Sequence, residues 1–444
     1  MYNKSLDKKV EVKMLIKFTV KNYLSFKKET SFDMLASKDK QFLEDNTFKF
    51  KDEYNILKSI VMYGANASGK SNLLKALRFF RSFIINSSKE TQLDETIPVE
   101  CFKLNNENIN EPSLFEVVFF IKDNRYRYGF EVTKKKVVNE WLFVTYTNRE
   151  SKLFIRKGNN FEIGDKFKEG KDLDKKTREN ALFLSVNAQF NGEISKEILN
   201  WFMNIHILMN DSKPGVTIAI LEDKRDKEKK KKLLNFLRYA DLSVEDFKVI
   251  SKEVNFEDMF KDMPFTFKFK EDFMKKNIGK KLDILSSKEV KTLHKIYQKD
   301  LKDFSFTEFD LDREESDGTQ RFFYLAGPII DTLMDGGILF IDEIESSLHP
   351  LLILEILKII NKNNLKKAQF FLTTHNVGIL SSDLLRRDQI LFSEKNKYGE
   401  SELFSLIDFK GHRIRKDASY EKDYLLGRYG AVPYLKKIEN SFIK

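Results

Sequence analysis

The stretch IVMYGANASGKSNLLKAL, residues 60–77, decides the fold. Its first four residues are apolar and predict a short buried strand, and the residues after Ser71 carry apolar side chains at helical spacing. Between them lies G-x-x-x-x-G-K-S, in which Gly64 and Gly69 allow successive N–H groups to turn toward one centre. A strand, a glycine-containing loop and a helix in this order predict a loop that binds phosphate at the N-terminus of the helix.

The residue types in this loop indicate a nucleoside triphosphate with Mg²⁺. Lys70 is expected to reach the terminal phosphates, and the Ser71 hydroxyl to coordinate the magnesium ion. The expected nucleotide-binding residues are those of the loop and the first helical turn: Gly64, Asn66, Ala67, Ser68, Gly69, Lys70, Ser71 and Asn72. The alternative is a purely structural loop.

Length and composition limit the class of protein. A chain of 444 residues with 41% hydrophobic and 33% charged residues has the composition of a globular protein with room for two or three domains. No apolar run reaches the roughly 18 residues that a membrane helix needs, and the single cysteine, Cys101, excludes an intramolecular disulfide. We therefore expect a cytoplasmic protein. The net charge of +10 is a weak indication of nucleic-acid binding, because AT-rich codon usage also enriches lysine.

An acidic motif lies in GGILFIDEIESSLHP, residues 336–350. The apolar run Ile338 to Ile341 predicts a buried strand, and Asp342 and Glu343 follow it at the edge where ligands of parallel α/β sheets bind. Asp342 is expected to hold Mg²⁺, directly or through water, and Glu343 to accept a proton from the attacking water. The alternative is that the two carboxylates only begin a helix.

A further strand is expected in AQFFLTTHN, residues 368–376, and it ends at His375. One predicted helix, Leu351 to Lys362, separates it from the acidic strand, so the two strands should lie near the same site. His375 would then face the terminal phosphate. A histidine at a strand end is by itself more often an ordinary hydrogen-bonded residue.

The remaining chain predicts a second, antiparallel sheet and an inserted segment. Strand patterns cover residues 15–20, 31–35, 115–121, 126–132, 141–146 and 153–155. From about Ser185 to Ser305 the sequence reads as helical, with helices expected within Glu222 to Ala240 and from Asp283 to Lys302. The lysine cluster Lys224 to Lys232 is either a solvated face or a surface for nucleic-acid phosphates.

Together with ESDGTQR, residues 315–321, these motifs resemble the Walker A, signature, Walker B with D-loop, and switch-histidine motifs of ABC-type ATPases. Within that class the chain is similar to the AAA_15/AAA_21-type branch. This branch includes the ATPase domains of OLD-family nucleases, Rad- and SMC-type ATPases, and the stand-alone ATPase subunits of abortive-infection or PARIS-like phage-defence pairs. The resemblance covers most of residues 14–80 and 306–430. It implies an α/β fold: an ABC-type ATPase head with a mixed central sheet, an antiparallel β subdomain and a helical insertion.

The resemblance also implies a site that two chains complete together. In such ATPases the signature of one head faces the phosphate loop of another, so two heads enclose two molecules of ATP with Mg²⁺. Ser316 and Gly318 would accordingly touch the γ-phosphate bound by the other chain, and Lys70, Glu343 and His375 would form the catalytic set. The alternative is that Ser316 is a plain helix cap. The implied partner is at least one further copy of this chain.

These assignments divide the chain into four parts: a disordered tail (1–13), an N-terminal ATPase lobe with the β subdomain (14–185), a lysine-rich helical insertion (186–305) and a C-terminal ATPase lobe (306–444). No confident Q-loop is found, because Gln92 is a poor candidate. The 69 residues after His375 contain no D-x-D pattern. We therefore expect no TOPRIM nuclease domain in this chain.

Two functions are consistent with these features. In the first, the ATPase pairs head to head and senses or regulates for a separately encoded effector, a TOPRIM-like nuclease or a toxin, in anti-phage defence. In the second, a repair or maintenance ATPase of the Rad/SMC-like type acts on DNA directly through the lysine-rich insertion. The segment Leu425 to Leu435 is expected either to be a packed turn or to dock the effector.

Overall fold

The computed structural model describes residues 13–89, 95–147, 149–210, 213–239, 243–254, 285–297, 304–409 and 419–433. The chain divides into two compact units, unit 1 with residues 1–212 and 331–444 and unit 2 with residues 213–330. The expected tail before Lys13, the Q-loop candidate Gln92 and the last two residues of the segment Leu425 to Leu435 lie outside the described residues.

The central sheet of unit 1 carries the predicted motifs. In spatial order its described strands are β11 (Ile205–Leu208), β15 (Ile338–Ile341), β16 (Gln369–Thr374), β5 (Ser59–Tyr63), β17 (Ile390–Lys395) and β18 (Ser401–Ser405). All neighbours pair in parallel except β17 and β18, which are antiparallel, so the sheet is mixed as predicted. Every residue of β5, β15 and β16 is buried, which explains why their sequences are almost continuously apolar.

Helices and a small hairpin accompany this sheet. They are α1 (Leu43–Asn46), β3 (Thr47–Phe50), β4 (Tyr54–Leu57), α2 (Lys70–Asn86), α9 (Pro350–Lys362) and α10 (Tyr420–Leu425). The helix predicted from Leu351 is confirmed as α9, which starts at Pro350, a residue whose fixed φ suits the first helical position. The Nδ1 atom of His349 caps it by accepting from the Leu351 N–H at 3.3 Å.

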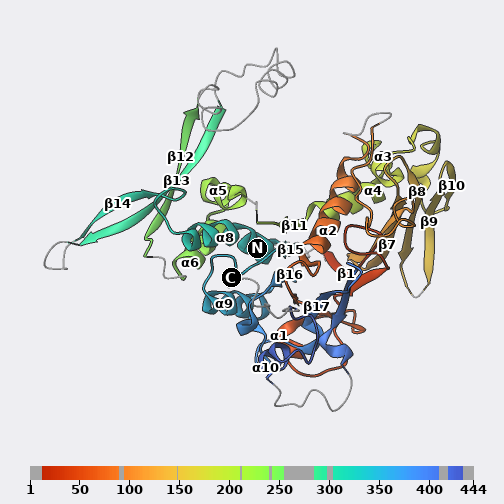
Figure 1. The fold of residues 1–444 in the computed structure, drawn as a ribbon. Helices are drawn as coiled ribbons and strands as arrows, with labels where there is room; N and C mark the ends of the chain where they lie inside the picture. The colour runs from red at the N-terminus through yellow and green to blue at the C-terminus, as the bar shows by residue number, and fades with distance from the viewer. Residues whose placement is uncertain are drawn as a thin grey trace, which may run out of the picture. The chain divides into compact units, whose positions relative to one another are not determined.

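A second sheet in unit 1 is antiparallel, as predicted. Its described strands are, in spatial order, β10 (Asn160–Ile163), β9 (Glu150–Lys157), β8 (Val137–Thr145), β7 (Asn124–Val132), β6 (Ser113–Ile121), β1 (Lys13–Lys21) and β2 (Thr30–Asp33). Figure 1 shows α2, α3 (Phe183–Gln189) and α4 (Glu193–Met203) beside this sheet. Aromatic side chains fill the space between them: Phe80 of α2 lies 5.2 Å from Phe130, and Trp201 of α4 stacks on Phe119 at 4.1 Å.

One glutamine joins the two sheets of unit 1. The side-chain amide of Gln369, at the start of β16, accepts from the Leu15 N–H at 2.6 Å and donates to the Leu15 carbonyl at 2.9 Å. Both groups are buried, so the glutamine side chain pairs with two buried main-chain groups of β1. The strand that precedes His375 is therefore fixed to the antiparallel sheet.

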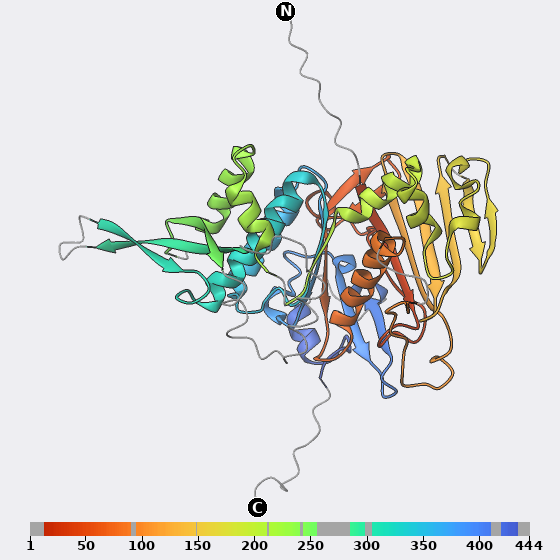
Figure 2. The ribbon, with the colours of Figure 1, turned by 90° about the horizontal axis from the view of Figure 1, so that it is seen from above.

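The described residues of unit 2 form two helices, three strands and the first part of a third helix. These are α5 (Gly215–Glu222), α6 (Lys227–Tyr239), β12 (Asp246–Val254), β13 (Leu285–Tyr297), β14 (Phe304–Asp310) and α8 (Asp317–Asp335). The described strands form an antiparallel sheet in the order β12, β13, β14, and they extend away from the helices (Figure 2). Phe322 and Phe323 of α8 stack on Phe236 and Phe247 at 5.1 and 5.0 Å.

The prediction of a helix from Asp283 to Lys302 is wrong, because residues 285–297 form β13. The segment contains the β-branched and aromatic residues Val290, Thr292, Ile296 and Tyr297, which favour strands. Val290 and Thr292 are buried two positions apart, which is the period of a strand rather than a helix. The helix expected within Glu222 to Ala240 is confirmed as α6.

The limits of the insertion also differ from the expected 186–305. Residues 186–212 belong to unit 1, because α4 buries Trp201 and Phe202 in its core and β11 pairs with β15. Residues 306–330 belong to unit 2, because β14 pairs with β13 and α8 packs on α6. In the described part of the chain, no helix is both long and apolar enough to cross a membrane.

A buried ion pair fixes α3 to the antiparallel sheet. The Glu140 carboxylate accepts from the Phe183 and Leu184 N–H groups at 2.7 and 3.0 Å and from the Tyr128 hydroxyl at 2.9 Å. Arg156 lies 3.7 Å away, and both side chains are fully buried. The carboxylate thus binds the first N–H groups of the helix, which have no partner inside it.

Replacing Glu140 with alanine is predicted to lower the free energy of unfolding by about 3–5 kcal/mol, because it leaves the Arg156 charge buried without its partner. Glu150→Ala is the matched control, since Glu150 pairs with Arg127 at the surface and such a pair contributes at most about 1 kcal/mol. Urea denaturation followed by circular dichroism measures both values. Equal losses in the two variants would contradict this role for Glu140.

Candidate functional site

The phosphate loop occupies residues 64–69, between β5 and α2. Its two glycines are required by their surroundings. Gly69 has φ 120°, and a Cβ atom there would lie 2.3 Å from the Ser401 Oγ. A Cβ atom on Gly64 would lie 2.4 Å from the Ser393 carbonyl oxygen. Only glycine therefore fits at either position in this loop conformation.

Hydrogen bonds from neighbouring segments fix the phosphate loop. The Ser68 carbonyl accepts from the hydroxyls of Ser393 at 3.1 Å and Ser401 at 2.6 Å, on β17 and β18. The Ala65 N–H donates to the Ala431 carbonyl at 3.0 Å. For residues 425–433, the described part of the segment Leu425 to Leu435, this contact agrees with the predicted packed turn and shows that the turn supports the loop.

Lys70 begins α2 and is buried behind the loop. Its ammonium group donates to the Gly64 carbonyl at 2.9 Å and the Ala65 carbonyl at 3.2 Å. Burial lowers the pKa of Lys70 to about 8, whereas the carboxylates of Glu345, Glu343 and Asp342 act to raise it. Lys70 therefore remains largely protonated at pH 7 and offers a positive charge to an anion in the loop.

His375 lies directly beyond β16, next to Lys70. Burial, with the Lys70 charge as the second cause, lowers the pKa of His375, so its ring is neutral at pH 7. The Lys70 Nζ lies 3.3 Å from the His375 Nδ1. Because an ammonium group can only donate, we assign Nδ1 as the acceptor and place the ring proton on Nε2. This Nε2 faces the Glu343 Oε1 at 4.0 Å.

The acidic pair is held by Thr373 of β16. The Thr373 hydroxyl donates to the Asp342 Oδ1 at 2.7 Å and accepts from the Glu343 N–H at 2.8 Å. Glu343 itself has φ 46°, a left-handed conformation that is uncommon for a residue with a side chain. One hydroxyl thus fixes both the side chain of Asp342 and the backbone of Glu343.

Glu345 adds a third carboxylate to this edge. Its Oε1 accepts from the His375 N–H, and its Oε2 is buried without a hydrogen-bond partner among the described residues. Glu345 and Thr373 were not predicted as site residues, although they lie within the motifs at residues 336–350 and 368–376. The signal was present in the third acidic residue of DEIE and the first threonine of TTHN, but the function of these residues depends on strand pairing.

The loop fits the triphosphate of a nucleotide with Mg²⁺. Ser68 Oγ is buried beside Gly64 and has no hydrogen-bond partner among the described residues, so the loop keeps an unused donor. Asn66 and Ala67 are exposed, and Ser71 and Asn72, in the first turn of α2, are half-buried. The Asn72 amide donates to the Ser25 hydroxyl at 2.9 Å, which ties this turn to the segment after β1.

Ser71 and Asp342 are the side chains suited to the metal ion. Across the described ranges, no group of three or more His, Cys, Asp or Glu side chains is arranged to hold a metal. Mg²⁺ that binds with a nucleotide needs few protein ligands, because phosphate oxygens and water supply the others. A hydroxyl and one carboxylate therefore suffice.

The predicted signature residues lie in unit 2. Ser316 precedes α8, and its Oγ accepts from the Thr319 N–H at 3.2 Å, which is the geometry of a helix cap. Ser316 is exposed and Gly318 is half-buried. Glu315 anchors this turn to β13, because its Oε1 lies 2.6 Å from the His294 Nε2. The cap that the sequence analysis gave as an alternative is therefore present, and the contact with a second chain remains a prediction.

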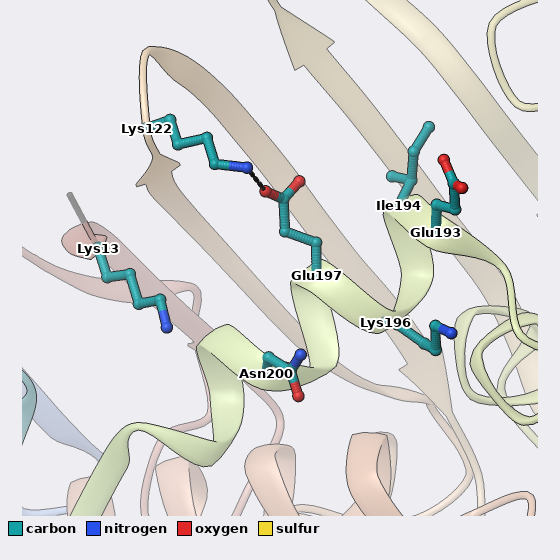
Figure 3. Close-up of a pocket in the computed structure, with 7 residues that line it drawn as sticks. All are labelled: Lys13, Lys122, Glu193, Ile194, Lys196, Glu197 and Asn200. Atoms are coloured by element: carbon teal, nitrogen blue, oxygen red, sulfur yellow. Dashed lines mark hydrogen bonds and ion pairs between the residues drawn. The ribbon is translucent and has the colours of Figure 1, made fainter. Parts of the chain in front are cut away.

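Two cavities of unit 1 differ in character. A cavity of about 900 Å³ is lined by the phosphate loop, His375 and the turn around Val432. A cavity of about 500 Å³ beside α4 is drawn in Figure 3, where Lys122 pairs with Glu197 at 2.6 Å. Its charged side chains stand on the surface of α4 and nearby strands. Of the two, only the larger cavity touches the predicted site residues.

A family model matches the part of the chain that contains this site. The AAA_21 family, described as "AAA domain, putative AbiEii toxin, Type IV TA system", matches residues 59–381. The match spans the phosphate loop, the acidic pair and His375. No curated protein matches the chain.

Three solved structures are similar at low identity. An Smc head bound to the C-winged helix domain of ScpA is 12% identical, with TM-score 0.41 and coverage of 88% of this chain and 97% of that chain. An SMC head domain from Thermotoga maritima is 12% identical, with TM-score 0.38 and coverage of 88% and 98%. An Smc head domain with an extended coiled coil, bound to the C-terminal domain of ScpA derived from Pyrococcus furiosus, is 11% identical, with TM-score 0.43 and coverage of 94% and 99%.

Gly69→Ala is predicted to abolish binding of ATP, because the new Cβ atom collides with Ser401 and forces the loop out of its conformation. Gly158→Ala is the control, since Gly158 also has positive φ, 57°, but no atom lies within 4 Å of a Cβ added there. Binding of a fluorescent ATP analogue measures the effect, and the melting temperature shows whether the variant is folded. Full-affinity binding by a folded Gly69→Ala chain would contradict this geometry.

Proposed function

The chain belongs to the AAA_21 family of AAA domains, and from this membership we propose that it binds ATP with Mg²⁺ and hydrolyses it to ADP and phosphate. One observation supports the proposal most. β5, β16 and β15 are neighbours, so the phosphate loop, His375 and the acidic pair follow the same ends of parallel strands. Such an edge is where ligands of α/β sheets bind.

Each residue has a role that its position supports. Lys70 contributes positive charge to the terminal phosphates, and the N–H groups of the loop bind their oxygens. Ser71 and Asp342 hold Mg²⁺, which offsets the charge on the transferred phosphoryl group when it is bound. The Glu343 carboxylate accepts a proton from the attacking water as the water oxygen bonds to the γ-phosphorus and the bond from the γ-phosphorus to the ADP oxygen breaks. His375 donates from Nε2 to the terminal phosphate.

We propose that two copies of the chain complete each site. Ser316 and Gly318, at the start of α8, offer a hydroxyl and an N–H group of the kind that binds anions at a helix N-terminus. The exposure of Ser316 supports this role, since an exposed cap is accessible to a second chain. The expected oligomer is a dimer whose heads meet around ATP.

We also propose that the chain acts with a separately encoded effector in cytoplasmic anti-phage defence. ATP binding and hydrolysis would either sense the trigger for this effector or regulate its activity. The description of the family, which names the AbiEii toxin and type IV toxin–antitoxin systems, supports a role in defence. The effector would be a nuclease, such as a TOPRIM-like nuclease, or a toxin. Co-purification of the chain with the product of the adjacent gene tests this part of the proposal, and a product that elutes separately with and without ATP contradicts it.

Glu343→Gln is predicted to keep ATP affinity but lower the hydrolysis rate about 10²–10⁴-fold, because the amide cannot accept the proton from water. The variant should retain unhydrolysed ATP, which rapid filtration with labelled nucleotide detects. Glu355→Gln in α9 is the control: it makes the same change at a partly exposed residue that pairs with Lys358, and it should hydrolyse ATP like wild type. Normal turnover by Glu343→Gln would refute the role of Glu343.

Ser316→Ala and Lys70→Ala are each predicted to be inactive alone but partly active when mixed, because the mixed dimer has one complete site. In an equal mixture about half of the pairs are mixed and each has one intact site of two, so we expect about one quarter of the wild-type rate per chain. Phosphate release by the separate and mixed proteins measures this. If mixing restores nothing, or Ser316→Ala alone is fully active, each chain hydrolyses ATP without a second copy.

A further inference from the structure

Asn210 contacts the carboxylate that we assign as the base. It follows β11, two residues beyond Leu208, and its Nδ2 donates to the Glu343 Oε2 at 2.6 Å. The contact follows from strand pairing: β11 lies parallel to β15, with Leu208 opposite Ile341, so the residues after the two strands come out at the same edge. No motif in the sequence includes Asn210.

The two oxygens of Glu343 have different surroundings. Oε2 accepts from Asn210, while Oε1 lies 4.0 Å from the His375 Nε2, too far for a hydrogen bond. The side chain is 36% exposed, so packing alone does not fix its rotamer. The hydrogen bond from Asn210 therefore decides how the carboxylate is turned, and it leaves Oε1 directed toward the side of the phosphate loop that His375 occupies.

An asparagine suits this contact chemically. Its amide donates a hydrogen bond but carries no charge, so it orients the carboxylate without neutralising it. A lysine or arginine in its place would form an ion pair and compete with the water proton for the carboxylate. The amide also cannot take up a proton itself, so proton transfer remains with Glu343.

We propose that Asn210 is a positioning residue for hydrolysis, one that holds Glu343 Oε2 so that Oε1 faces the attacking water. The inference rests on the proposed function, because it requires Glu343 to be the base. β11 is the last strand before the chain enters unit 2, and β15 is the first strand after it returns. The contact thus joins the two strands between which unit 2 is inserted.

Asn210→Ala is predicted to lower kcat about 10–100-fold, because a carboxylate that is free to turn spends little time in the reactive orientation. The Kd for ATP should stay unchanged, because Asn210 is not one of the residues that we expect to bind phosphate. Asn210→Asp has the same shape but places an acceptor against the carboxylate, and it should be at least as slow as Asn210→Ala. Asn210→Gln keeps the amide and should recover part of the rate.

Asn204→Ala is the matched control, because Asn204 lies just before β11 and its side chain donates to the Asn200 carbonyl at the end of α4. It should hydrolyse ATP at the wild-type rate. The decisive comparison adds Asn210→Ala to Glu343→Gln. If Asn210 acts through Glu343, the double variant should be no slower than Glu343→Gln alone.

The outcomes separate this inference from the proposed function. If the wild-type chain with Mg²⁺ binds or hydrolyses no ATP, the proposed function fails. If wild type hydrolyses ATP but Asn210→Ala and Asn210→Asp, both folded by melting temperature, match Asn204→Ala in kcat, only the inference about Asn210 is wrong. An added loss of rate in the double variant would likewise show that Asn210 does not act through Glu343.

Discussion

The parallel pairing of β16 with β5 on one side and β15 on the other is the constraint on which the site depends. It brings three segments that are distant in the sequence, around residues 64, 342 and 375, to one edge of the sheet. Thr373, in the middle strand, then binds both residues of the acidic pair. A shift of β16 by one residue would turn Thr373 away from that pair and move His375 away from Lys70.

Several contacts outside the site keep β16 and the loop in place. Gln369 fixes the start of β16 to β1 of the antiparallel sheet, and Ser393 and Ser401 hold the loop from β17 and β18. These side chains are polar and buried, so each must be paired to avoid the cost of desolvation. The cost of misplacing them explains how the positive φ angles of Gly69, 120°, and of Glu343, 46°, persist.

Local motifs predicted much of this architecture. The phosphate loop, the apolar strand before Asp342 and the helix from Leu351 each have a signal within a short window, and the structure contains all three. The strand β13 was predicted as a helix, because its lysines and leucines matched a helical pattern, whereas its strand conformation depends on pairing with β12 and β14. Asn210, Thr373 and Glu345 could not be predicted as site residues for a related reason. Their proposed roles depend on pairing between strands, which a single sequence does not display.

The central claim is that the edge formed by these strands hydrolyses ATP only when a second chain supplies Ser316. The rate of phosphate release per chain, measured over a range of chain concentrations at saturating ATP and Mg²⁺, tests it most directly. The account predicts a rate per chain that is low in dilute solution, rises with concentration and reaches a plateau as dimers form. A rate per chain that stays constant down to concentrations at which sedimentation detects only monomers would contradict it.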